Sequence, residues 1–124
     1  RRFHPVGALL RVELDPDSWM SWGLPQEITA WIGAEDTLVA EPPVRVVARF
    51  PDVERLQLGG LLWPEAAGRI ARTAYCTREG VGRGQIILYL DNPAFRAWML
   101  DTRRHFLNSV LYGPGLGAEW PRPW

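Results

Sequence analysis

The chain has no lysine, one cysteine and two histidines among its 124 residues. Cys76 alone cannot form a disulfide within the chain, so cysteine usage leaves the cellular compartment undecided. His4 and His105 are not part of a His-x-x-Glu pattern, and a zinc site would need more ligands than they supply. We therefore expect no metal and no cofactor in this chain.

Net charge and long apolar runs are also absent. Fourteen arginines balance fourteen acidic residues, so no net field holds a polyanion, and nucleic-acid binding is not expected. No apolar run reaches the roughly 18 residues of a membrane span, so we expect no such span. The apolar content of 47% is enough for one core, and residues 1–124 are expected to form a single domain. Because the sequence begins abruptly, we expect a C-terminal fragment of a longer chain.

Apolar alternation predicts strands, and proline, glycine and helical spacing mark their ends. The expected strands cover residues 8–14, 28–32, 44–50, 72–78 and 85–90, with weaker candidates at 38–40 and 56–63. The expected helices cover residues 64–71 and 102–112, the second ending at Gly113-Pro114-Gly115. This pattern predicts an α/β or α+β fold, with a mixed sheet of about five or six strands and a C-terminal helix packed on it.

The glycine-rich stretch at residues 80–84 precedes a strand, whereas a phosphate-binding loop opens a helix. It therefore predicts a β-hairpin in which Gly82 and Gly84 supply unusual backbone angles. Residues 85–90 are apolar on both faces, which is typical of the central strand of a covered sheet. In the following helix, Phe106-Leu107 and Val110-Leu111 have the spacing of a packing face.

The C-terminal third carries a family resemblance. Its residues are Gly82-Arg83-Gly84 before an apolar strand, Asn92-Pro93-x-Phe95-Arg96 after it, and Thr102 with Phe106-Leu107-Asn108 in the last helix. Upstream, Gly7-Ala8-Leu9-Leu10-Arg11-Val12, Asp15-Pro16 and Gly60-Leu61-Leu62 agree with it. This order resembles the C-terminal half of the glutamine-amidotransferase-like domain attached to bacterial zinc carboxypeptidases of the carboxypeptidase A type. The chain departs from that pattern at Leu90-Asp91, where the family tends to have Gly-Phe, and at Asp101, where it tends to have Gly.

The resemblance implies an amidotransferase-like, flavodoxin-like layer and a role beside a peptidase. The zinc ligands and the catalytic glutamate would lie in the preceding peptidase domain, which would be this chain's partner within one polypeptide. This chain would then be a non-catalytic accessory domain of a secreted or periplasmic hydrolase, with homo-oligomers also possible. The parent substrate is not implied by these residues.

Three residues are candidates for catalysis or ligand binding by this chain itself. A glutaminase cysteine needs a strained elbow with a histidine and an acid nearby, but Cys76 lies within an expected strand and is interpreted as a buried small residue. Arg96 follows the expected central strand, where its guanidinium could hold a carboxylate or brace the loop. Asn108, within the last helix, is a weaker ligand candidate and is interpreted mainly as a buried amide.

Seven tryptophans are many for this length. Tryptophan buries a large area at low entropic cost, so it is frequent at interfaces. The expected interface residues are Trp19, Trp22, Trp98, Trp120 and Trp124. Two alternatives stay open: a free-standing module that binds sugars or peptides through its tryptophan loops, and an amidotransferase-like enzyme whose nucleophile lies upstream.

Overall fold

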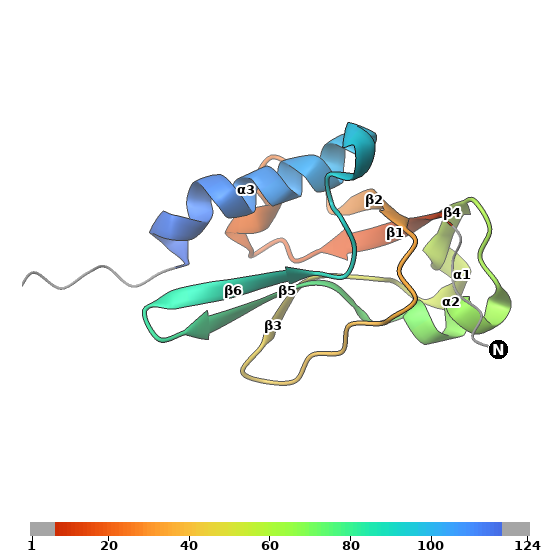
Figure 1. The fold of residues 1–124 in the computed structure, drawn as a ribbon, viewed down its shortest axis with the longest axis horizontal. Coiled ribbons are helices and arrows are strands. Elements are labelled where there is room, and N and C mark those ends of the chain that lie inside the picture. Colours follow the sequence, from red (N-terminus) through yellow and green to blue (C-terminus); the bar gives the residue numbers. More distant parts are fainter. Residues whose placement is uncertain (1–6, 118–124) are drawn as a thin grey trace, which may run out of the picture.

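One curled antiparallel sheet organises the computed structural model, which describes residues 7–117 (Figure 1). Within those residues the strands are β1 Ala8–Leu14, β2 Glu27–Ile32, β3 Arg45–Arg49, β4 Gln57–Gly59, β5 Ala74–Val81 and β6 Gly84–Tyr89. The helices are α1 Val53–Leu56, α2 Pro64–Ile70 and α3 Leu100–Leu116, with short 3-10 helices η1 Trp19–Ser21 and η2 Phe95–Ala97. The strand order is β2-β1-β3-β5-β6, and β4 pairs with β1.

Strand β1 is bonded along both of its edges. It pairs with β2 from Ala8 to Glu13 on one edge. On the other edge it pairs with β3 at its C-terminal end and with β4 at its N-terminal end. Its side chains alternate between buried and half-buried, as its sequence predicts for a strand with one face in the core.

Helix α3 and η1 lie on one side of the sheet, whereas α1 and α2 lie at the end of the sheet near β4 (Figure 1). The core joins the buried faces of β1 and β2 to residues from η1, α1, α2 and β5. Its largest fully buried apolar members are Leu10, Met20, Ile32, Phe50, Leu56, Ile70 and Tyr75.

The expected fold class is confirmed: a mixed α/β fold with a sheet of this size and a C-terminal helix. The sheet itself is not mixed, because every strand pair formed by residues 7–117 is antiparallel. A flavodoxin-like layer is built on parallel strands, so the sheet formed by residues 7–117 does not have that arrangement.

The hairpin between β5 and β6 forms as predicted, with Gly82 and Arg83 as its two-residue turn. Gly82 has a φ of 58°, which suits the first central position of a type II′ turn. Gly84 has no such angle and belongs to β6. The expected central position of β6 is wrong for the described residues, because β6 lies at the edge of the sheet.

Two helix boundaries also differ from expectation. Residues 53–56 form the short helix α1, which the sequence did not reveal, and only residues 57–59 of the expected strand are extended. Helix α3 begins at Leu100 and continues through Gly113 and Pro114 to Leu116. Pro114 is tolerated in the last turn because its missing N–H leaves only the carbonyl of exposed Val110 without a helical partner.

We expect Gly60→Ala to destabilise the fold by more than about 2 kcal/mol. Gly60 has a φ of 77°, and a Cβ there would lie 2.6 Å from the carbonyl oxygen of Gly7, which is backbone and cannot turn away. Gly80→Ala is the control, because a Cβ at Gly80 meets no atom within 4 Å. Urea denaturation followed by circular dichroism measures both, and equal midpoints would contradict this account of Gly60.

Candidate functional site

The segment between β6 and α3 places an arginine among aromatic rings. Phe95 stacks on Trp31 of β2, with ring centroids 4.0 Å apart and planes 5° from parallel. The Cζ atom of Arg96 lies 5.3 Å from the ring centroids of both Phe95 and Trp98. Such distances are those of cation–π contacts, so the two rings hold the guanidinium in place.

The backbone of this segment is strained. Arg96 and Ala97 have φ values of 48° and 54°, in the left-handed region that side chains with a Cβ rarely occupy. Each such residue costs on the order of 1–3 kcal/mol, which the surrounding contacts must offset. The carboxylate of Asp91 supplies part of this support by accepting hydrogen bonds from the backbone N–H groups of Gly33 and Ala34, at 2.8 and 3.0 Å.

Arg96 is exposed, and among residues 7–117 its guanidinium has no ion pair or hydrogen bond. Its donors therefore point into solvent and are able to receive a carboxylate or another oxyanion. The expected setting is different, however. Because β6 is an antiparallel edge strand, Arg96 does not lie at the carboxyl edge of a parallel sheet, where such sheets bind ligands.

Asn108 is 1% exposed and its amide is hydrogen-bonded within the protein. Its Nδ2 donates to the carbonyl oxygens of Met20 and Trp22, at 2.8 and 2.9 Å, and its Oδ1 accepts from Nε of Arg104 at 3.2 Å. The side chain therefore ties α3 to η1, and neither of its two N–H donors is left over for a ligand.

His105 lies on the same buried side of α3. Its Nδ1 shares a hydrogen bond of 2.8 Å with the hydroxyl of Tyr89, and its Nε2 has no partner among residues 7–117. Burial lowers the pKa of His105 from 6.5 to about 4, because the charged form cannot be solvated there. The neutral ring serves packing, and no carboxylate orients it as a catalytic base.

Cys76 is completely buried within β5. Burial raises the pKa of its thiol to about 12, so the nucleophilic thiolate is not formed near neutral pH. The strand also lacks the sharp turn that presents a catalytic nucleophile.

Helix α3 turns its leucines toward solvent and three of its polar residues toward the protein. Thr102, His105 and Asn108 face the protein and are buried. Leu107 and Leu111 are 43% and 68% exposed, and the other exposed apolar residues of the helix are Leu100, Phe106, Val110 and Leu116. The predicted packing face is thus wrong for this chain, because the polar side chains find specific partners inside and the leucines do not.

The tryptophans expected at an interface differ in how exposed they are. Trp19 was expected at an interface but is only 8% exposed, because it lies on η1 beneath the C-terminal half of α3. Trp22 and Trp98 are 52% and 58% exposed, and Trp22 also contacts the ring of Tyr112 edge to face. Trp120 and Trp124 lie outside the described residues.

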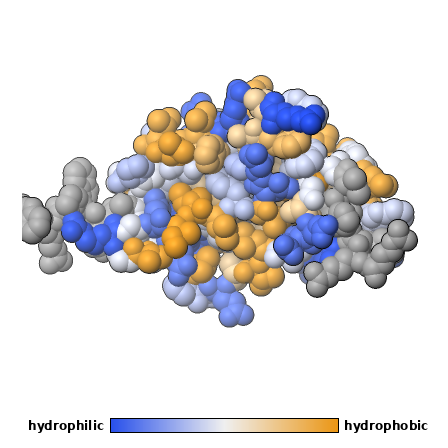
Figure 2. Space-filling view, viewed as in Figure 1, coloured by the Kyte–Doolittle hydropathy of each residue, from blue (hydrophilic) through white to orange (hydrophobic). Residues whose placement is uncertain are grey.

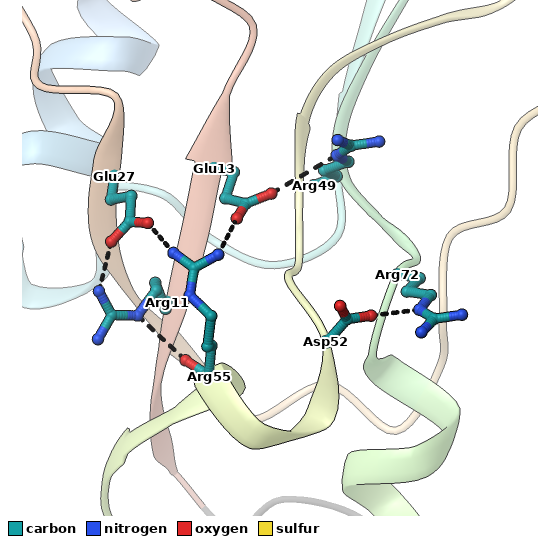
Figure 3. A network of polar contacts seen from close by, with 7 residues as sticks. All are labelled: Arg11, Glu13, Glu27, Arg49, Asp52, Arg55 and Arg72. Carbon is teal, nitrogen blue, oxygen red and sulfur yellow. Dashed lines mark hydrogen bonds and ion pairs between the residues drawn. The ribbon is translucent and has the colours of Figure 1, made fainter.

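A network of ion pairs crosses the other face of β1 and β2 (Figure 3). Arg55 of α1 binds both Glu13 and Glu27, and Arg11 binds Glu27 as well. Arg49 and the pair formed by Arg72 and Asp52 border the same region, beside a groove of about 300 Å³. The sequence did not single out these residues. The four arginines drawn share three carboxylates, which leaves a net charge of about +1, and each guanidinium is already paired.

The part of the chain that the structure describes contains neither a metal-ligand cluster nor a membrane-spanning helix. No group of three or more histidine, cysteine, aspartate or glutamate side chains lies close enough to hold a metal ion. No helix there is long and apolar enough to cross a membrane.

Comparison of the chain with protein-family models, with curated proteins and with solved structures gave no match. The geometry of residues 7–117 therefore carries the functional argument, and the likeness to an amidotransferase-like accessory domain remains a proposal. Two features of that geometry are accessible at the surface: the Arg96 loop and the exposed side of α3.

We expect folding stability to fall as the pH drops from about 6.5 to about 4. In that interval the unfolded chain protonates His105 and the folded chain does not, so protons favour unfolding by about 3 kcal/mol at most. His105→Gln keeps a polar side chain that does not titrate, and its stability should depend less on pH in this interval. Urea denaturation at a series of pH values measures the difference, and identical slopes for the two proteins would contradict the expectation.

We expect the Cys76 thiol to be inert in the folded chain. A thiol reagent such as DTNB should react only after denaturation, because the side chain is fully buried. Cys76→Ala should cost about 1 kcal/mol of stability, as a small truncation in the core. Rapid modification of the native chain would show that the strand opens readily or that the thiol is accessible.

Proposed function

We propose that this chain is a non-catalytic accessory domain that packs on a neighbouring domain through the outer side of α3. The observation that carries the proposal is the orientation of this helix: Thr102, His105 and Asn108 are buried, and Leu107 and Leu111 stand in solvent. An apolar helix face that residues 7–117 leave uncovered is typical of a contact surface.

Neighbouring residues extend this surface. Leu100 and Trp98 are 64% and 58% exposed at the N-terminal end of α3, and Trp22 lies against Tyr112 near its C-terminal end. Figure 2 shows apolar side chains gathered on the side of the molecule where α3 and β6 lie. Large aromatic and aliphatic side chains of this kind supply most of the binding energy at protein interfaces.

The partner proposed is the peptidase domain of a zinc carboxypeptidase-like polypeptide. This part of the proposal rests on the resemblance in the C-terminal third of the sequence. It agrees with the lack of catalytic geometry at Cys76 and His105, since an accessory domain needs none. Zinc and the hydrolytic chemistry would then belong to the partner.

The double variant Leu107→Glu with Leu111→Glu tests the surface. Both side chains are exposed, so the fold of the isolated chain should lose less than about 1 kcal/mol. Affinity for the preceding domain, produced as a separate polypeptide and measured by calorimetry, should fall about 100-fold or more.

Val39→Glu is the matched control, because Val39 is 75% exposed in the loop before β3 and away from α3. This variant should bind as the native chain does. Equal affinity for native and double-variant chains would contradict a contact through α3, and loss of folding in the double variant would show that the leucines belong to the core.

The Arg96 loop supports a second candidate, a module that binds a small anionic or carbohydrate ligand. The open guanidinium of Arg96 and the exposed ring of Trp98 form a site for a carboxylate beside an apolar surface. Arg96→Gln would abolish such binding and leave contact through α3 intact, so that variant separates the two candidates.

A further inference from the structure

The outer edge of β6 carries free backbone hydrogen-bonding groups. The N–H of Leu90 donates to the carbonyl of Tyr75, so these two opposed residues form a hydrogen-bonded pair of the antiparallel ladder between β5 and β6. Because bonded and non-bonded pairs alternate, the N–H and C=O groups of Gln85, Ile87 and Tyr89 point away from β5. These groups have no hydrogen-bond partner among residues 7–117.

The sequence of β6 lacks the residues that usually protect an edge strand against strand addition. Natural edge strands carry charges, prolines or bulges that prevent pairing with another strand. The sequence of β6 is Gly-Gln-Ile-Ile-Leu-Tyr, with no charge and no proline, and its register with β5 is continuous. Ile86 and Leu88 are 54% and 50% exposed on one face of the strand. The strand therefore has the composition of an interior strand in an edge position.

Helix α3 forms a wall beside the same edge. A groove of about 400 Å³ lies between Gln85 and Ile87 of β6 and Val110 and Pro114 of α3. At the other end of β6, Phe106 contacts the ring of Tyr89. A strand added here would find free backbone groups along its length and apolar side chains of α3 beside it.

An arginine lies near each end of β6. Arg83 lies in the hairpin turn at one end, and Arg103 lies in α3 three residues before Phe106, whose ring contacts Tyr89 at the other end. Neither has an ion pair among residues 7–117. Charge complementarity therefore selects acidic residues at both ends of an incoming segment.

We propose that the free edge of β6 binds an extended polypeptide segment that is apolar in its centre and acidic at both ends. The segment pairs with the backbone of Gln85, Ile87 and Tyr89 and becomes an additional strand of the sheet. This edge is a separate surface from the outer side of α3 around Leu107 and Leu111, and the inference does not depend on the accessory role proposed above.

The probe is the synthetic peptide acetyl-Glu-Val-Ile-Thr-Ile-Val-Glu-amide, added to the full 124-residue chain and followed by NMR hydrogen exchange. Binding should slow the exchange of the Gln85, Ile87 and Tyr89 amides. The Ile86 and Leu88 amides should change little, because they already face β5. The same peptide with lysine in place of both glutamates should bind about tenfold more weakly.

Two variants make the test specific. Arg83→Glu combined with Arg103→Glu should reverse the preference, so that the lysine-flanked peptide binds better. Ile87→Pro removes an outward N–H without removing a bond to β5, and it should abolish binding of both peptides. The charge-reversed variant keeps the test valid if the proline variant does not fold.

Three results would overturn the proposal. The first is unchanged exchange of the three outward amides at millimolar peptide. The second is equal affinity for the two peptides in the native chain. The third is protection of these amides in the peptide-free chain: if it persists on dilution, another part of the chain fills the edge, and if it rises with concentration, a second copy is the occupant.

Discussion

The rotation of α3 about its own axis determines what this molecule offers to a partner. Three polar contacts fix that rotation: Asn108 with the carbonyls of η1, His105 with Tyr89, and Thr102 with the carbonyl of Pro93. Gln85 adds a fourth by donating to the carbonyl of Gly113 at 2.8 Å. Buried polar groups left without partners are costly, so these contacts outweigh the burial of leucine. The apolar side of the helix must then face solvent.

Strand β6 and helix α3 share one property: each exposes apolar side chains at the surface formed by residues 7–117. Ile86 and Leu88 are exposed on one element, and Leu107 and Leu111 on the other. The hydrophobic pattern of a sequence reflects which side chains are buried in the assembled protein. Some of those side chains are exposed when one chain is taken alone.

Local signals predicted most of the secondary structure. The alternation of β1, the proline that begins α2 and the glycine turn before β6 depend on nearby residues only, and each lies where the sequence placed it. Helix α1 was missed because a single turn of four residues has almost no periodicity. The edge position of β6 and the rotation of α3 depend on partners distant in sequence, which a pattern does not encode.

The sequence predicted which residues belong to the candidate site but not how they are arranged. The positions of Arg96 and Trp98 in the sequence marked them as candidates, but the stacking of Phe95 on Trp31 of β2 joins two segments that are distant in sequence.

The hydrogen bonding of β1 along both of its edges also joins segments that are distant in sequence, and this affects how fast the sheet forms. Its second edge is completed by β3 and β4, which follow it only after β2 and a long connection. Non-local pairing of this kind slows folding, so we expect the edge of β1 that residues 45–59 complete to form more slowly than its pairing with β2.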